Sequence, residues 1–212
     1  MNIVLIGASG YVGSALLEEA LARGHQVTAL VGHPEKLANR PNVAALKTDA
    51  LDTGALSGQL RGHDAVISAF SGHAQADVYG YYVRGMRSII AATKASGVPR
   101  LLVVGGAASL EVAPGVQLLD TPEFPAQWKE TAAGAREALN LLRAEPQLDW
   151  TFLSPSAHLE PGARSGQFRL GGDQLLIGAD GQSRISLQDY AVAMIDELEK
   201  PAHSRQRFTV GY

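Results

Sequence analysis

The chain has 212 residues, 46% of them hydrophobic, and a formal net charge of −3, which suits one globular domain able to bury a core. It contains no cysteine, so disulfides, thiolate nucleophiles and zinc–sulfur sites are excluded, and its charge balance favours neither nucleic acid nor an anionic membrane as partner. Because Met1 leads directly into an apolar run, and no run approaches the ~20 residues that span a bilayer, we expect a cytoplasmic protein.

Apolar segments of strand length alternate with segments of helical composition along the whole chain. Near-continuous apolar strands between helices are typical of a parallel sheet covered on both faces, so the pattern predicts an α/β fold. The expected strands are residues 3–6, 26–31, 43–48, 64–70, 100–104 and 150–153, with 207–210 as a possible seventh. The expected helices are residues 14–23, 53–60, 82–95, 129–144 and 187–199.

The first strand leads into three glycines and then into a helix. This strand–turn–helix spacing is typical of a dinucleotide-binding loop, although a glycine triplet can also be a chance turn. Gly7 would allow the tight turn, Gly10 the approach of a pyrophosphate to the backbone, and Gly13 the close packing of the helix. The positive end of that helix would then hold the phosphates. The predicted cofactor-binding loop is Gly7, Ala8, Ser9, Gly10, Tyr11, Val12 and Gly13.

The tip of the second strand indicates which dinucleotide is bound. An NAD site usually places an acid there, about 20 residues after the glycines, to bind the ribose 2′-hydroxyl, and positions 29–33 contain none. Glu35 follows a proline, which suits capping of the next helical turn. Gly32, His33 and Lys36 are therefore assigned to the cofactor, with His33 and Lys36 near a 2′-phosphate, and NADP(H) is predicted to be preferred over NAD(H).

Ligands of parallel sheets bind at the carboxyl ends of the strands, so the remaining strand ends supply the other candidates. After the third strand, Asp49 is assigned to the adenine amino group, with Ala50 and Leu51 beside it, and Asp52 to capping of the next helix. Small residues at later strand ends leave room for the ribose, the pyrophosphate and the nicotinamide. These candidates are Ala69, Phe70, Ser71, Gly105, Ser109, Pro155, Ser156 and Ala157. Residues 105–127 have no clear period and are expected to form a functional flap.

These motifs resemble the atypical short-chain dehydrogenases/reductases, and within them the NADH–flavin reductase-like group, which is related to biliverdin reductase B and to the NmrA-like proteins. The matching pieces are GASGYVG at 7–13, DALD at 49–52, DAVIS at 64–68, RLLVVGG at 100–106, LDWTFLSP at 148–155 and SRISLQDYA at 183–191. The resemblance implies one NAD(P)-binding domain over residues 1–212. Its fold would be a Rossmann-type doubly wound parallel sheet of strand order 3-2-1-4-5-6, with a small C-terminal part at 154–186 beside the substrate.

The chain departs from the larger superfamily in its acid–base residues. Ordinary members use a Tyr-x-x-x-Lys pair, in which the lysine lowers the pKa of the tyrosine and the tyrosine exchanges a proton with the substrate. None of the six tyrosines here has a lysine four residues later. Lys129 lies where the lysine-bearing helix should begin, but position 125 is a proline. Ser109 and Lys129 stay as catalytic candidates, with Trp128 and Lys129 as a substrate-facing pair.

Flavin reduction needs no such acid, because a hydride adds to an electron-poor ring and solvent can supply the proton. The favoured hypothesis is therefore an NAD(P)H-dependent oxidoreductase that passes hydride to FMN, riboflavin or a similar flat aromatic acceptor. One alternative is an NmrA-like redox sensor that binds dinucleotide without turnover. Another is an NAD-dependent, epimerase-like isomerase.

Aromatic and histidine side chains leave further questions open. Residues 79–82 carry three tyrosines that would either stack on a flat ring or pack a helix or dimer contact. The six histidines lack paired metal-ligand spacing, so no metal site is predicted, although His73 and His158 could line the cleft. The protein is expected to be a monomer or homodimer.

Overall fold

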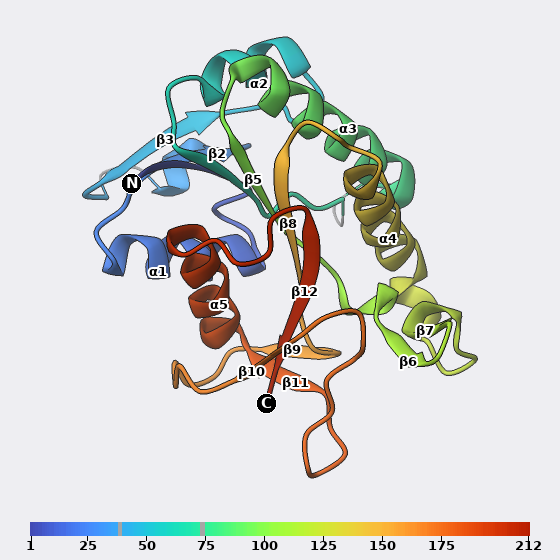
Figure 1. Cartoon of the computed structure of the whole chain (residues 1–212). Coiled ribbons are helices and arrows are strands. Elements are labelled where there is room, and N and C mark those ends of the chain that lie inside the picture. The colour runs from blue at the N-terminus through green and yellow to red at the C-terminus, as the bar shows by residue number, and fades with distance from the viewer. Residues whose placement is uncertain (38–39, 73–74) are drawn as a thin grey trace.

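One mixed sheet runs through the described residues, which are 1–37, 40–72 and 75–212 of this computed structural model. Across them, eight strands lie in the order β10-β12-β8-β5-β4-β1-β2-β3 (Figure 1). These strands are β1 Asn2–Ile6, β2 Gln26–Val31, β3 Val43–Lys47, β4 Ala65–Ser68, β5 Arg100–Val104, β8 Asp149–Ser154, β10 Arg169–Gly171 and β12 Gln206–Gly211. Two small pairs stand apart: β6 Glu111–Ala113 with β7 Val116–Gln117, and β9 His158–Glu160 with β11 Arg184–Ser186.

All strands of the large sheet except β10 are parallel to their neighbours. Counted along the chain, they confirm the predicted Rossmann-type order 3-2-1-4-5-6 and the possible seventh strand, β12. The antiparallel edge strand β10 was not predicted. Its three residues, Arg-Leu-Gly, are too short to show a period, and Leu170 is 51% exposed.

Helices cover the sheet on both faces, as the pattern predicts. Helices α1 Tyr11–Ala22 and α5 Leu187–Glu199 pack together on one face, whereas α2 Thr53–Leu60, α3 Val78–Ser96 and α4 Lys129–Arg143 cover the other (Figure 1). Alternate residues of β1 separate the two cores: Ile3 and Leu5 join the first, and Val4 and Ile6 join the second.

Two helices begin before their predicted first residue. Helix α3 begins at Val78 rather than at 82, because the Asp77 carboxylate accepts a hydrogen bond of 2.8 Å from the Gly80 N–H and caps the helix. Gly97, at φ 77°, ends it. Helix α1 begins at Tyr11 rather than at 14, directly after Gly10.

The expected flap is folded rather than irregular. It contains the hairpin of β6 and β7 and the short 3-10 turns η2 Ala107–Ser109 and η3 Leu118–Asp120, and the turn η4 Ala126–Trp128 leads from its end into α4. The hairpin and the β9–β11 pair both lie beyond the carboxyl ends of the strands, at the lower end of the view in Figure 1. No helix in the described part of the chain is long and apolar enough to cross a membrane.

Candidate functional site

A cleft of about 870 Å³ opens at the carboxyl ends of the central strands. One wall comes from the first turn of α1 and the ends of β4 and β5, and the other comes from the folded flap and the start of α4. The apolar or small residues of this cleft include Ala69, Val104, Gly105, Gly106, Ala107, Ala108, Ala132 and Ala135. The cleft therefore joins the glycine loop to the flap, and its size suits a small-molecule site.

The glycine loop has the geometry that its spacing predicts. Gly7 has φ +80°, and a Cβ added there would lie 2.6 Å from the carbonyl oxygen of Ala69. A Cβ on Gly13 would lie 2.0 Å from the carbonyl oxygen of Gly7, so only glycine lets α1 approach the strand this closely. The Gly10 N–H donates to the same Gly7 oxygen at 3.0 Å and closes the turn.

The N-terminus of α1 is open toward the cleft. Gly10 is its N-cap residue, and within the described residues no side chain caps the helix. The first intrahelical hydrogen bond runs from the Ser14 N–H to the Gly10 carbonyl at 2.9 Å. Gly10, Tyr11 and Val12 line the cleft, so the N–H groups of this first turn and the positive helix end are directed into it. These residues fit the pyrophosphate of a dinucleotide.

Several predicted strand-end residues meet in the cleft: Ala69, Phe70, Ser71, Gly105 and Ala157. Two glycines keep this wall compact. A Cβ on Gly105 would lie 2.2 Å from Cε1 of Phe152, and a Cβ on Gly85 would lie 2.2 Å from Cε1 of Phe70. Gly105 thus makes room for the Phe152 ring beneath the cleft. The position of Gly105 at a strand end did not indicate this need for glycine.

Other predicted residues lie outside the lining. Ala8 and Pro155 are buried, and Ser156 is 1% exposed and donates its hydroxyl to the carbonyl of Val210 at 2.9 Å. The side chain of Ser156 is therefore held by β12. Ser109 is 3% exposed, and its hydroxyl accepts a long 3.4 Å hydrogen bond from Arg207.

The two residues of the predicted substrate-facing pair differ in position. Trp128 lines the cleft, whereas Lys129, the exposed first residue of α4, does not. The structure thus brings neither catalytic candidate, Ser109 or Lys129, into the lining, and their roles stay predictions.

The residues assigned to the adenosine half lie at the tips of β2 and β3. Asp49 accepts a hydrogen bond of 2.9 Å from the Leu51 N–H and is exposed. Asp52 caps α2 by accepting from the Ala55 N–H at 3.0 Å, as predicted. His33 Nδ1 lies 3.0 Å from Oε1 of Glu35, so this acid pairs with His33 in the 3-10 turn η1 Pro34–Leu37. Gly32, His33 and Lys36 are all exposed there.

Aromatic side chains line one part of the cleft. The Phe70 ring packs against Tyr81 and Tyr82, with centroid distances of 5.4 and 5.9 Å. Tyr82 is 4% exposed and reaches the cleft, and burial raises the pKa of its phenol. Phe124 and Trp128 line the same cleft from the flap and η4. Tyr82 thus both packs within the protein, against Phe70, and forms part of the cleft wall.

Several lining residues were missed or left open at the sequence level. Thr131, Ala132 and Ala135 of α4 and Leu118, Thr121 and Phe124 of the flap all line the cleft. The small residues at 132 and 135, one helical turn apart, were the available signal. His158 lines the cleft as considered, and His73 lies outside the described residues.

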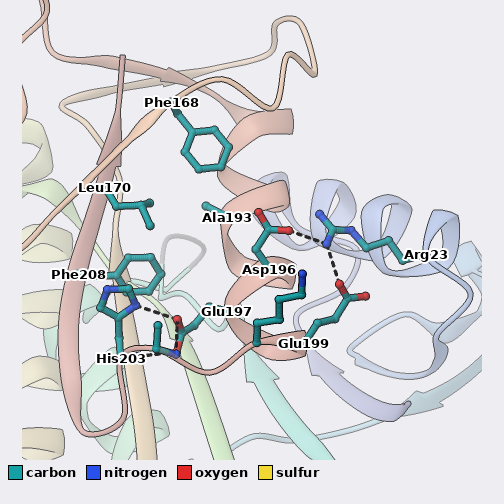
Figure 2. Close-up of a pocket in the computed structure, with 11 residues that line it drawn as sticks. Arg23, Phe168, Leu170, Ala193, Asp196, Glu197, Glu199, His203 and Phe208 are labelled. Carbon is teal, nitrogen blue, oxygen red and sulfur yellow. Dashed lines mark hydrogen bonds and ion pairs between the residues drawn. The ribbon is translucent and has the colours of Figure 1, made fainter.

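A second cavity, of about 340 Å³, is lined by residues of α5, β10 and β12 (Figure 2). Its carboxylates are paired: Arg23 contacts Asp196 and Glu199, and buried Glu197 accepts from His203 and, at 2.6 Å, from Arg100. Its residues include none from the glycine loop. Within the described residues, no group of histidine, cysteine and acidic side chains could hold a metal ion.

The chain is similar to known proteins over its whole length. A family model described as NAD(P)H-binding matches residues 7–201. The protein YwnB of Bacillus subtilis (strain 168) is 43% identical over 213 residues, covering 99% of this chain and 98% of that protein.

Two solved structures share the fold along its length. A candidate epimerase from Bacteroides thetaiotaomicron is 46% identical with a TM-score of 0.93, covering 100% of this chain and 96% of its own. SP1627, a candidate NADH-flavin reductase from Streptococcus pneumoniae TIGR4, is 34% identical with a TM-score of 0.89, covering 100% and 99%. With the glycine loop and strand order, these matches place the chain in the NAD(P)H-binding family of nicotinamide dinucleotide proteins, among the atypical short-chain dehydrogenases/reductases.

Proposed function

We propose that this protein is an NAD(P)H-dependent oxidoreductase that reduces a flavin or a similar flat aromatic acceptor. The observation that carries this proposal is one continuous cleft, which starts at an open helix N-terminus and ends between aromatic rings. The similarity of the whole chain to SP1627, the candidate NADH-flavin reductase from Streptococcus pneumoniae, supports the same activity.

Different residues of the chain bind the different parts of the cofactor and the acceptor. The N–H groups at the start of α1 bind the pyrophosphate, and Asp49 with Ala50 and Leu51 holds the adenine. Gly105 and Ala157, which line the cleft, and buried Pro155 shape the nicotinamide end. When bound, the nicotinamide supplies a hydride, and solvent supplies a proton to the reduced acceptor. Phe70, Tyr82, Phe124 and Trp128 orient the flat ring and exclude water from one side.

We propose a preference for NADP(H) over NAD(H). At the tip of β2, His33 and Lys36 are exposed, and Glu35 is the acid of this turn and already contacts His33. A 2′-phosphate would meet Lys36 and His33 there, whereas a 2′-hydroxyl would find no carboxylate at the usual strand-tip position.

The test is NADPH and NADH oxidation by the purified protein with riboflavin, FMN and quinones as acceptors. We expect NADPH oxidation with flat acceptors and none with ketones, no NADP⁺ reduction by secondary alcohols, and a selective loss of NADPH affinity in Lys36→Ala. The rate of hydride transfer should fall by less than roughly 100-fold, the lower end of the range for acid–base catalysis, in each of the variants Ser109→Ala, Lys129→Met and Tyr82→Phe.

The alternatives make different predictions in the same assay. A redox sensor would bind NADPH tightly and consume none with any acceptor. An epimerase-like isomerase would convert its substrate with no net oxidation of the cofactor, and the likeness to the Bacteroides candidate epimerase keeps this outcome in the test. Either result would overturn the reductase proposal.

We further propose that residues 154–186 form the substrate-side part of a single domain. The β9–β11 pair of this segment lies beyond the carboxyl ends of the strands, and Tyr11 of the glycine loop donates to the Leu159 carbonyl of β9 at 3.2 Å. Removal of this hydrogen bond in Tyr11→Phe should weaken acceptor binding more than it weakens cofactor binding.

A further inference from the structure

The charges around the cleft are unevenly distributed. Among the described residues that line it, Glu123 is the one acidic side chain, and neither a lysine nor an arginine is among them. Glu123 lies on the flap, between η3 and η4, next to Phe124 of the aromatic wall. The acceptor end of the cleft is therefore apolar with one carboxylate at its border.

Glu123 makes no ion pair within the part of the chain that the structure describes. The second cavity offers a direct contrast, because there Asp196, Glu197 and Glu199 each contact an arginine or a histidine (Figure 2). The negative charge of Glu123 thus acts on whatever enters the cleft, and no lysine or arginine among the described lining residues offsets it.

Two arginines that contact residues of the flap are engaged with carboxylates. Arg136 of α4 binds both oxygens of Asp120, at 2.8 and 2.9 Å. The Nε of buried Arg207 donates to Asp173 at 2.7 Å. The positive end of α1 is taken by the pyrophosphate in the proposed function.

The groove beside the cleft does not supply a cation either. This neighbouring groove shares His158 with the cleft and holds Glu160 and Arg184. The Arg184 guanidinium contacts Asp180 at 2.6 Å, so its charge is also matched. An acceptor tail that extended past His158 would meet Glu160 with its carboxylate and a neutralised arginine.

We propose that the acceptor is an uncharged flat ring compound, such as riboflavin or a quinone without acidic groups, and that Glu123 selects against acceptors that carry a phosphate or carboxylate. This inference rests on the proposed reductase function. A phosphate monoester carries about −1.5 to −2 charges at pH 7, and moving it beside the Glu123 carboxylate, with no lysine or arginine among the described lining residues, opposes binding.

The experiment compares riboflavin with FMN, which share one ring system and differ in the phosphate. We expect kcat/KM for riboflavin to exceed that for FMN by about tenfold at low salt, with the gap narrowing as ionic strength rises, because exposed charges are screened. Glu123→Gln should narrow the gap by about threefold, as expected for loss of one nearby surface charge. Glu130→Gln removes a carboxylate that does not line the cleft and should leave the ratio unchanged.

The variant Lys129→Met tests the opposite preference, in which FMN is the better substrate. If Lys129, exposed beside the cleft, received the phosphate, FMN would be the better substrate and Lys129→Met would abolish its advantage. That outcome, or equal use of the two flavins, would overturn the inference.

Binding measurements keep the inference separate from the reductase proposal. Quenching of flavin fluorescence by the NADP⁺-loaded protein reports affinity without turnover. Tighter riboflavin than FMN binding in a protein that oxidises no NADPH would uphold the charge selection and defeat the reductase. Tighter FMN binding, or binding of neither flavin, would overturn the charge selection.

Discussion

The glycines of the first loop restrict the backbone at positions only a few residues apart. Gly7 needs its positive φ, and Gly13 needs the absence of a Cβ because the carbonyl oxygen of Gly7 occupies that space. Gly10 is less crowded, since a Cβ there would lie 3.2 Å from the same oxygen. Substitutions at these positions should therefore separate folding from binding.

Gly13→Ala is expected to reduce the free energy of unfolding by about 1–3 kcal/mol or more, because a methyl 2.0 Å from a carbonyl oxygen forces the helix away from the strand. Urea denaturation followed by circular dichroism measures the change. Gly58→Ala in α2 is the matched control: its new methyl meets open space, so it should stabilise the helix by about 0.5–1 kcal/mol. A Gly13→Ala protein as stable as the parent would contradict the packing argument.

Gly10→Asp is expected to abolish dinucleotide binding while costing little stability, because it places a carboxylate against the pyrophosphate at the open end of α1. Isothermal titration calorimetry with NADPH measures the loss. Gly58→Asp, at an exposed position of α2, adds the same charge away from the cleft, and this variant should bind NADPH normally. Near-normal affinity in Gly10→Asp would remove the glycine loop from the site.

Single residues differ in how far the sequence can place them. Gly13 is set by the carbonyl oxygen of Gly7, six positions earlier, and Gly7 by its positive φ in the turn that follows β1, so the spacing of the two glycines was sufficient. Ser156 is set by the Val210 carbonyl, 54 positions further along the chain, and only the pairing of β8 with β12 brings the two together. Ser109 likewise depends on Arg207, 98 positions away.

At the scale of elements, the aromatic wall joins pieces that are distant in the chain. Phe70 follows β4, Tyr82 belongs to α3, and Phe124 and Trp128 come from the flap and η4. Packing of α3 against α4 brings these pieces to the same side of the sheet, where a Cβ on Gly134 would lie 3.1 Å from Cδ1 of Tyr82. The aromatic part of the cleft is thus built where two helices pack.

Trp128→Ala should raise KM for the acceptor by about twofold to tenfold, the range that aromatic pair energies of ~0.5–1.5 kcal/mol imply, and leave cofactor affinity unchanged. Steady-state kinetics with riboflavin and NADPH separate the two effects. Tyr79→Ala is a suitable control, since Tyr79 is an aromatic residue of comparable exposure outside the cleft. An equal change in both variants would show that Trp128 does not contact the acceptor.

Some element boundaries followed from the sequence, whereas others depend on caps or on short strand pairs. The bounds of α2 and α5 agree with the expected residues. The start of α3 depends on Asp77, whose capping role is visible only once its carboxylate meets the Gly80 N–H. The β6–β7 hairpin has three and two residues, too few for alternation to show.

Across the whole molecule, buried ion pairs connect parts that the sheet alone does not join. Glu19 of α1 accepts two hydrogen bonds from Arg164, at 2.7 and 2.8 Å, and one from Arg23. Its side chain is 5% exposed. This carboxylate therefore ties the C-terminal segment around residue 164 to the helix that carries the glycine loop.

Stability should depend on the ionisation of Glu19. The hydrogen bond from Arg164 holds the pKa of this carboxyl below its usual range, in spite of burial, so its contribution is complete above the unfolded pKa of about 4.3 and is lost as pH falls through the folded value. Glu19→Gln should reduce the free energy of unfolding by about 1–3 kcal/mol at pH 7, and this difference should shrink below about pH 4.

Urea denaturation at several pH values measures this dependence. Glu18→Gln serves as the control, because Glu18 pairs with Arg40 with its side chain 63% exposed, and such surface pairs contribute about 0–1 kcal/mol. A Glu19→Gln difference that stayed constant down to pH 3 would contradict the assignment.

The strand order also determines how the chain is assembled during synthesis. β1, the first strand made, lies in the interior of the sheet, and the first 68 residues hold β3, β2, β1 and β4, which form one half. Until Arg100–Val104 leaves the ribosome, the β4 side of that half-sheet is a row of unpaired backbone groups, a template for association with other chains. The nascent protein thus passes through an interval in which elongation speed or a chaperone, rather than its own final contacts, protects it from aggregation.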